Sequence, residues 1–193
     1  MIYVVFGVPG VGKTAVVDKV IEQTGIKHVI WGDLTEEYMV KNKMIEDRDE
    51  MRKLDIRQQR PIQIEVAEEI VKMSKGSEGQ NTDTDILIET HAAIKTPQGY
   101  WPGMNFDVFT KIKPDIFIVI EAAAKNILSR RQKDETRERK DDLNLQAVED
   151  HLQITRDMAS TFAVLTGGTV FYVENKEGDV GYAVGKIVEM MGK

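Results

Sequence analysis

The chain has 193 residues, the usual length of one domain, and 41% of them are hydrophobic, which is enough to bury a full core. It contains no cysteine, so disulfides, thiolate metal sites and a cysteine nucleophile are excluded. The net charge of -6 argues against a nucleic-acid partner, and no apolar stretch is long enough to span a membrane.

The first predicted element is a strand over Ile2–Phe6. The next eight residues, Gly7-Val8-Pro9-Gly10-Val11-Gly12-Lys13-Thr14, fit the P-loop motif G-x-x-x-x-G-K-[ST] and lead into a helix predicted over Lys13–Thr24. The glycines allow backbone N–H groups to surround a phosphate, Lys13 reaches the outer phosphates and the Thr14 hydroxyl binds Mg²⁺. A plain glycine turn is the alternative, but all four motif positions are in register. Because Met1 leads straight into the strand, no room remains for a signal peptide, and we expect a cytoplasmic protein.

Apolar runs and segments of helical period alternate along the rest of the chain, which predicts parallel strands joined by helices. The further predicted strands are 27–31, 85–89, Ile116–Glu121 and 170–174. The further predicted helices are 33–41, 48–54, 58–75, Phe106–Ile112, 123–132, 143–165 and 180–191, with Pro61 in the first turn of the helix over 58–75. We therefore predict one α/β domain over 1–193, with a five-stranded parallel sheet between two layers of helices. The strands lack polar alternation, which predicts burial on both faces.

Residues 33–75 form an insertion of about forty residues, longer than an ordinary crossover between parallel strands, and are expected to build a second site. Within it, 47–53 is rich in acids and bases. This segment is typical of a solvated helix, and Arg48 and Arg52 gain interest only from lying in the insertion.

Glu89 ends the third predicted strand, at the edge where ligands bind in open α/β sheets. It can hold Mg²⁺ through water, or it can be a structural acid bound to helix N–H groups. His91 either orients Glu89 or the substrate, or is structural. His28 and His151 have no candidate partner in the sequence, and three scattered histidines make a transition-metal site improbable.

Two further segments bear on the site. Residues 95–103 hold two prolines, two glycines and two aromatics, which predicts a shaped loop that either presents Lys95 to an anion or is merely well packed. Residues 130–140 hold six bases and three acids. Arg130, Arg137 and Arg139 can converge only if the helix breaks, and Asp141 and Asp142 supply a cap for a new helix. A mobile arginine hairpin over a triphosphate is favoured over a charged helix face.

The sequence favours phosphoryl transfer to a phosphate. It contains no D-x-x-G motif, and Asn175-Lys176-Glu177-Gly178 departs from N-K-x-D, so a GTPase switch lacks its parts. Basic residues are abundant and no clear catalytic base is present, which suits an acceptor that is already ionised.

At this point the chain resembles the archaeal-type adenylate kinases, a branch of the nucleoside monophosphate kinases, over essentially its full length. The resemblance rests on GVPGVGKT at 7–14, GD at 32–33, EDRDEMRKL at 46–54, THAAIKTPQGYWPG at 90–103, DETRER at 134–139 and VLTGGTV at 164–170. One departure is Glu89-Thr90-His91, where the family pattern reads D-T-H, so the carboxylate is longer by one methylene.

The resemblance implies that ATP and AMP react reversibly to give two ADP with Mg²⁺, in a homotrimer, with a monophosphate-binding insertion over 33–75 and a lid over 130–142. It implies that ATP is bound by Gly7, Val8, Pro9, Gly10, Val11, Gly12, Lys13, Thr14 and Ala15. Lys13, Arg130, Arg137 and Arg139 would be catalytic. Arg48, Arg52 and Lys95 would bind AMP, while Thr14 and, through water, Glu89 would hold Mg²⁺. A CMP or UMP kinase and a nucleotide-regulated assembly ATPase are the alternatives.

Overall fold

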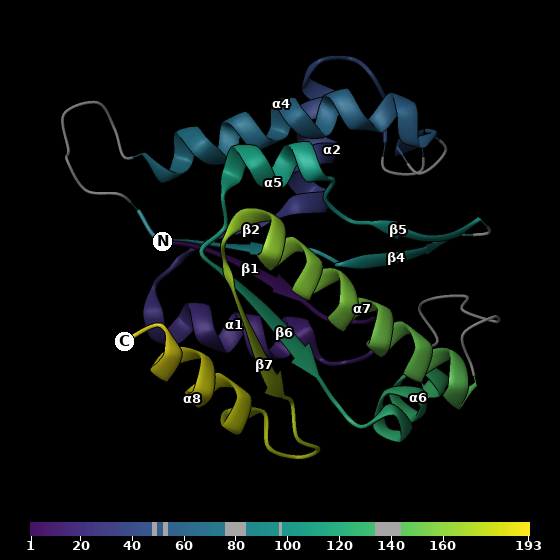
Figure 1. The fold of residues 1–193 in the computed structure, drawn as a ribbon, viewed down its shortest axis with the longest axis vertical. Helices are drawn as coiled ribbons and strands as arrows, with labels where there is room; N and C mark the ends of the chain where they lie inside the picture. Colours follow the sequence, from purple (N-terminus) through teal and green to yellow (C-terminus); the bar gives the residue numbers. More distant parts are fainter. Residues whose placement is uncertain (48–49, 52–53, 76–83, 97, 134–143) are drawn as a thin grey trace.

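The structure, a computed structural model, describes residues 1–47, 50–51, 54–75, 84–96, 98–133 and 144–193. A five-stranded parallel sheet forms its centre, in the order β2-β3-β1-β6-β7 (Figure 1). Its strands are β1 (Ile2–Phe6), β2 (Lys27–Ile30), β3 (Ile86–Glu89), β6 (Ile116–Glu121) and β7 (Thr169–Glu174). The predicted α/β fold with five parallel strands is confirmed.

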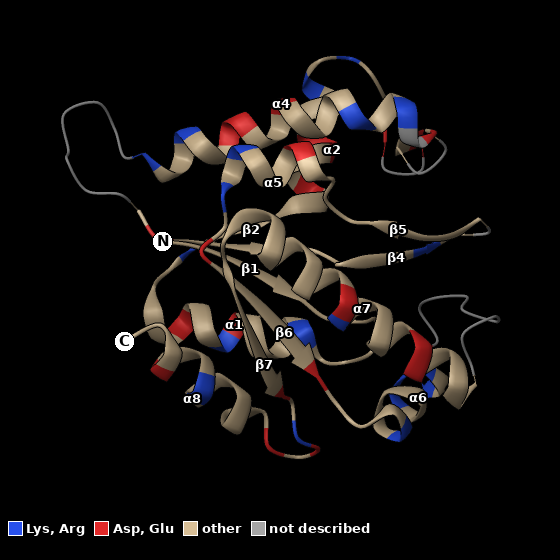
Figure 2. Cartoon of the chain, in the orientation of Figure 1, with Lys and Arg blue, Asp and Glu red and all other residues tan. Residues whose placement is uncertain are grey.

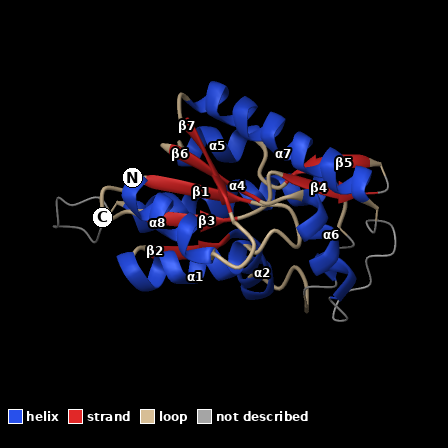
Figure 3. Cartoon of the chain, turned by 90° about the horizontal axis from the view of Figure 1, so that it is seen from below, coloured by secondary structure: helices blue, strands red, loops and turns tan. Residues whose placement is uncertain are grey.

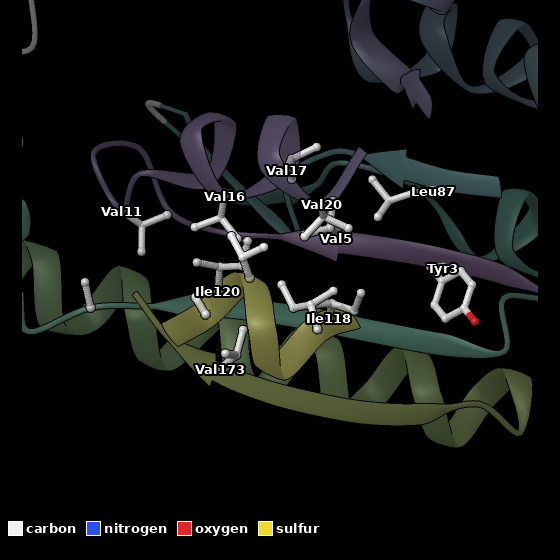
Figure 4. Packing of buried hydrophobic residues seen from close by; sticks show 14 of the residues in the cluster. Tyr3, Val5, Val11, Val16, Val17, Val20, Leu87, Ile118, Ile120 and Val173 are labelled. Atoms are coloured by element: carbon white, nitrogen blue, oxygen red, sulfur yellow. The ribbon is translucent and has the colours of Figure 1, made fainter. Parts of the chain in front are cut away.

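Helices cover both faces of the sheet (Figure 1). Figure 3, seen from below, shows the five strands side by side, from β7 at the top to β2 at the bottom. One face carries α1 (Lys13–Thr24) and α8 (Val180–Met190), and the other carries α4 (Ile56–Ser74), α5 (Phe106–Ile112) and α7 (Leu145–Thr166). On the first face, Val16 and Val20 of α1 pack with Val5 of β1 (Figure 4). Within the described residues, no helix combines the length and apolar character that crossing a membrane requires.

The strands differ in burial according to their place in the sheet. β1, β3 and β6 lie between two neighbours and are buried almost throughout. β2 and β7 are the edge strands, and they expose Lys27 and Tyr172. The prediction of burial on both faces is therefore right for the inner strands and wrong for the edges, because an edge strand has a neighbour on one side only.

The observed strand β2 ends one residue before the predicted end at residue 31. Trp31 instead begins the helix α2 (Trp31–Lys41). Its side chain is buried in the core over the α4 face, and its carbonyl accepts a hydrogen bond from Oγ1 of Thr35 at 2.7 Å. An apolar residue at a strand end and one at the start of a helix look alike in sequence, since both are buried.

The helix predicted over 58–75 begins two residues earlier, at Ile56, because Asp55 caps it. Oδ1 of Asp55 accepts hydrogen bonds from the N–H groups of Arg57 at 2.8 Å and Gln58 at 2.9 Å, and the Gln58 side chain accepts from the Asp55 N–H at 3.0 Å. This capping box moves Pro61 into the second turn, so its predicted place in the first turn is wrong.

The structure also corrects the predicted start of the long helix α7. Asn144 is its N-cap, and Oδ1 of Asn144 accepts a hydrogen bond from the N–H of Ala147 at 2.7 Å. The caps predicted at Asp141 and Asp142 are therefore not those of this helix, and both residues lie outside the described ranges. The preceding helix, α6 (Ala124–Lys133), contains Arg130 and Arg131.

Charged side chains of both signs share the surface helices. Figure 2 shows basic and acidic residues together on α1, α4 and α8. Between α4 and α5, Lys111 forms an ion pair with Glu68. Acids and bases are equal in number on each of α1, α4 and α8, so the excess of acids in the composition does not lie on these three helices.

An ion-pair cluster joins the two ends of the chain at Asp85, the residue before β3. The N-terminal amine lies 2.5 Å from Oδ1 of Asp85, and Nζ of Lys193 lies 3.3 Å from Oδ2. The hydrogen bond from the N-terminus lowers the pKa of the Asp85 carboxyl below its ordinary value of 3.8. A lowered folded-state pKa stabilises the protein above the unfolded value, and the effect is lost as the pH falls towards the folded one.

We therefore expect Asp85→Asn to lower the free energy of unfolding at neutral pH by at most about 1 kcal/mol, because exposed ion pairs contribute little. The difference from wild type should shrink as the pH falls below 3.8. Urea denaturation of both proteins over a pH series measures it. A difference that is independent of pH would show that packing, and not charge, is responsible.

Candidate active site

The loop between β1 and α1 has the backbone that a bound phosphate requires. Gly10 and Gly12 have φ values of 85° and 87°, which side-chain-bearing residues rarely adopt. A Cβ on Gly12 would lie 2.4 Å from Nδ2 of Asn175. Gly12 is also the N-cap of α1 and no side chain caps this helix, so its first N–H groups are available to an anion.

Three side chains hold carbonyl oxygens of this loop. Nδ2 of Asn175 and Nη1 of Arg130 donate to the carbonyl of Val11 at 2.8 and 3.0 Å, and Nε of Arg131 donates to that of Pro9 at 2.8 Å. Because these donors satisfy the carbonyls, the loop conformation is fixed before a nucleotide binds. Arg130, a predicted catalytic residue, thus lies against the loop, and it also pairs with Glu177.

Arg131 and Asn175 were not predicted as site residues. Both are buried, although one is an arginine, and their partners lie 122 and 164 positions away. One signal was present for Asn175, which directly follows the last strand and therefore lies at the carboxyl edge of the sheet.

Glu89 ends β3, which pairs with β1, so its carboxylate reaches the loop. Nζ of Lys13 lies 2.5 Å from Oε1 of Glu89, and Nε2 of His28 lies 3.3 Å from Oε2. Burial would raise the pKa of the Glu89 carboxyl, but the contacts with His28 and Lys13 outweigh burial and lower the pKa to about 2. Glu89 is therefore ionised at neutral pH.

These contacts bear on two expectations from the sequence. In the described part of the chain, the recorded partners of Glu89 are the side chains of Lys13 and His28, not the N–H groups of a helix. The expectation that His28 has no partner is wrong, because strand pairing brings it to Glu89. His151 also has a partner, since its Nε2 lies 3.0 Å from the carbonyl oxygen of Ala93.

His91 supports the backbone of the loop. Its Nδ1 lies 3.1 Å from the carbonyl oxygen of Gly7. Burial, with a smaller effect from Lys13, lowers the pKa of His91 to about 4. The ring is therefore neutral at neutral pH, and Nδ1 carries the proton that it donates to Gly7. This geometry favours the structural alternative for His91.

The segment predicted as a loop over 95–103 is mainly a β-hairpin. β4 (Ala93–Thr96) and β5 (Gly99–Pro102) pair antiparallel, with Thr96 opposite Gly99. Gly99 and Pro102 are the first and last residues of β5 and Gly103 follows it, where they do not interrupt pairing, while Pro97 lies outside the described residues. Lys95 is exposed on β4 opposite Tyr100, whose ring centroid lies 5.2 Å from that of His151.

The structure describes some of the predicted site residues, and others lie outside its described ranges. Thr14 and Ala15 lie in the first turn of α1 and are exposed, next to Lys13. Of the helix predicted over 48–54, the structure describes residues 50, 51 and 54. Residues 50 and 51 are helical, and Leu54 is outside any helix. Arg48, Arg52, Arg137 and Arg139 lie outside the described residues.

The residues present suit Mg²⁺ better than a transition metal. The Thr14 hydroxyl and the ionised Glu89 carboxylate are oxygen donors, which Mg²⁺ prefers. No group of three or more histidines and acids gathers as a metal site within the described ranges. An ion here would therefore be held mainly by water and nucleotide phosphates, as is usual for Mg²⁺.

Comparisons with known proteins agree with this site. The family model described as "AAA domain" matches residues 6–149. The adenylate kinase of Methanopyrus kandleri is 38% identical over 189 residues, which cover 97% of this chain and 96% of the relative. The adenylate kinase of Thermoplasma acidophilum is 38% identical over 188 residues and 97% of both chains. That of Methanocaldococcus jannaschii is 37% identical over 195 residues, or 98% of this chain and 97% of the relative.

Among solved structures, the shikimate kinase from Acinetobacter baumannii in complex with shikimate superposes with a TM-score of 0.54 at 16% identity, over 98% of this chain and 91% of that chain. A likeness at this identity supports the fold alone. The curated relatives carry more weight, because they match at 35–38% identity over nearly their whole length. They do not favour the two alternatives, and the protein belongs to the adenylate kinase family of phosphotransferases.

Proposed function

We propose that this protein catalyses the reversible, Mg²⁺-dependent reaction of ATP with AMP to give two ADP. The observation that supports this most directly is the phosphate loop with Lys13 against the ionised Glu89, at the carboxyl edge of a parallel sheet. The full-length relationship to archaeal adenylate kinases supports the choice of nucleotides.

The reaction needs charge stabilisation more than acid–base chemistry. The phosphate of AMP is already ionised, so no side chain has to remove a proton from the acceptor. Residues 7–15 bind the donor phosphates through backbone N–H groups and the start of α1. Lys13 turns from Glu89 to the outer phosphates, where its ammonium stabilises charge on the transferring group.

The proposal gives Mg²⁺ two ligands of this chain, the Thr14 hydroxyl directly and the Glu89 carboxylate through water. When bound, the ion neutralises the phosphate oxygens. Glu89 suits this role because its lowered pKa keeps it ionised over the whole physiological range.

The acceptor side of the proposal comes from the sequence. Arg48, Arg52 and Lys95 would bind the AMP phosphate, in the insertion over 33–75 and on the hairpin. Arg130, Arg137 and Arg139 would stabilise the transferring group from a lid over 130–142, which excludes water and so suppresses hydrolysis of ATP. Arg130 is close enough to the phosphate loop for this role, because it donates a hydrogen bond to the carbonyl of Val11.

One arginine allows a direct kinetic test. We expect Arg137→Ala to lower kcat by about 100-fold while the affinity for ATP changes by less than about fivefold, because the guanidinium acts on charge that develops during transfer. Steady-state kinetics and equilibrium ATP binding measure the two quantities. An unchanged kcat would remove Arg137 from the lid assignment.

Acceptor specificity tests the proposed reaction itself. Purified protein with ATP and Mg²⁺ should form ADP with AMP far faster than with CMP, UMP or GMP in a coupled assay. Turnover on a pyrimidine nucleotide but not on AMP would favour the first alternative. Slow hydrolysis of ATP that AMP does not affect would favour the assembly ATPase.

We also propose that the protein works in the cytoplasm as a homotrimer, as the family resemblance implies. The expected mass of such an assembly is three times the 21.8 kDa of one chain. Light scattering on the eluting protein measures this mass directly, and a monomer would contradict the trimer without affecting the reaction.

A further inference from the structure

We propose that His28 is a positioning residue, which holds the Glu89 carboxylate in place when Lys13 leaves it for the nucleotide phosphates. The inference rests on the proposed function, because it assumes that Glu89 holds Mg²⁺ through water. His28 lies on β2, an edge strand, and belongs to no motif of the sequence.

Strand pairing places His28 on the same side of the sheet as Glu89. In the parallel pair of β2 and β3, His28 is opposite Leu87 and Ile30 is opposite Glu89. Residues two apart on a strand share a face, so all four side chains lie on one face. Leu87 packs in the core beneath α1, the helix that begins with Lys13. His28, Glu89 and Lys13 therefore meet on one side of the sheet.

Each oxygen of the Glu89 carboxylate has its own partner. Oε1 lies 2.5 Å from Nζ of Lys13, while Oε2 lies 3.3 Å from Nε2 of His28. That nitrogen is fully buried, and within the described residues it makes no hydrogen bond of good geometry. Oε2 of Glu89 is the carboxylate oxygen beside this nitrogen, and a small movement of the carboxylate towards His28 would give it a hydrogen bond.

The two partners differ in what nucleotide binding does to them. Lys13 is the P-loop lysine and has to reach the phosphates, so it must leave Oε1 of Glu89. The Glu89 side chain is only 10% exposed, and a buried charge that loses its partner is costly. His28 is fixed to the sheet by β2 and stays beside Oε2. His28 therefore stays in contact with Glu89, while Lys13 moves from the Glu89 carboxylate to the nucleotide phosphates.

The length of the acid explains why a second contact is needed. A glutamate has one more rotatable side-chain bond than an aspartate, so its carboxylate is less firmly placed by the strand that carries it. A partner on the adjacent strand removes this freedom. The contact acts through Glu89, and its expected effect is on Mg²⁺-dependent binding of the nucleotide.

Calorimetric binding of a non-hydrolysable ATP analogue tests the role, with excess Mg²⁺ and with EDTA. His28→Leu should weaken binding about tenfold in Mg²⁺ and less than about twofold in EDTA, as expected for a residue behind a metal ligand. His28→Gln places an amide N–H near the position of Nε2 and should retain most of the Mg²⁺-dependent affinity. In a Glu89→Asp background, whose acid is one methylene shorter, His28→Leu should have little further effect.

Lys27→Gln is the matched control. It changes the neighbouring residue on β2, whose side chain is exposed and points to the other face, and both affinities should stay at the wild-type value. Equal losses in Mg²⁺ and EDTA, a glutamine variant no better than leucine, or no loss at all would each overturn the proposal. Wild-type protein that binds the Mg²⁺ nucleotide but forms no ADP would refute the proposed function and leave this inference standing.

Discussion

Lys13→Ala is expected to lower kcat/KM for ADP formation by about 1,000-fold, the largest loss we predict for a single side chain. Lys13 is the one side chain that the P-loop motif assigns to the outer phosphates, and the structure places it at the first position of α1. Its side chain is only 10% exposed, so its charge acts where water screens little. A coupled assay of ADP formation with ATP, AMP and Mg²⁺ measures the loss.

Lys19→Ala is the control for this variant. It removes the same charge from the same helix, but Lys19 is exposed, so activity should stay within about twofold of wild type. Circular dichroism should show both variants folded. More than a tenth of wild-type activity in Lys13→Ala would contradict the proposed role of this lysine.

Gly12→Ala is expected to lower nucleotide affinity by about 100-fold and the free energy of unfolding by about 2 kcal/mol. Two causes act together. Gly12 has a φ of 87°, which strains any residue with a Cβ, and the new methyl group would lie 2.4 Å from Nδ2 of Asn175. Because Asn175 holds the carbonyl of Val11, moving it disturbs the loop that binds the phosphates.

Gly185→Ala on α8 is the matched control for this substitution. A Cβ there meets no atom within 4 Å, and alanine favours a helix interior over glycine by about 1 kcal/mol. We expect this variant to be slightly more stable and fully active. Equilibrium nucleotide binding and urea denaturation of both variants check the pair, and wild-type affinity in Gly12→Ala would remove the close contact with Asn175 from the account of the site.

Most of the secondary structure could be predicted from the sequence, because the spacing of apolar residues differs between a buried strand and a helix with one buried face. The strands Ile2–Phe6 and Ile116–Glu121 and the helix Phe106–Ile112 have the predicted bounds. The errors fall where a local signal is ambiguous. Trp31 is apolar and buried in either state, and Asp55 competes with Pro61 as a helix-start signal.

The hairpin of β4 and β5 was missed for a different reason. Its strands have four residues each, too short to show a period, and the prolines and glycines within 95–103 of the sequence suggested a loop throughout. Strand pairing is a contact between segments, so its stability depends on the partner strand and on what packs against it. Tyr100 packs against His151 of α7, a contact that no local pattern indicates.

The residues of the candidate site also divide into those that a local pattern predicts and those that only contacts between distant segments bring in. Lys13 and Glu89 were predicted as site residues from the motif and from the strand end, and the structure places their side chains in contact. His28, Arg131 and Asn175 were not found as site residues, since each reaches it through a contact with a distant segment. Arg48, Arg52, Arg137 and Arg139 stay predictions, because they lie outside the described residues.

The sequence by itself determined the phosphate loop and the family, because the P-loop residues are consecutive and their chemistry depends on backbone freedom, one ammonium and one hydroxyl. Only the tertiary structure decided the strand order β2-β3-β1-β6-β7 and hence which side chains surround Glu89. The physical reason is that apolar periodicity records which face of an element is buried but not which element covers it. Strand pairing supplies that information, and it places His28 beside the acid.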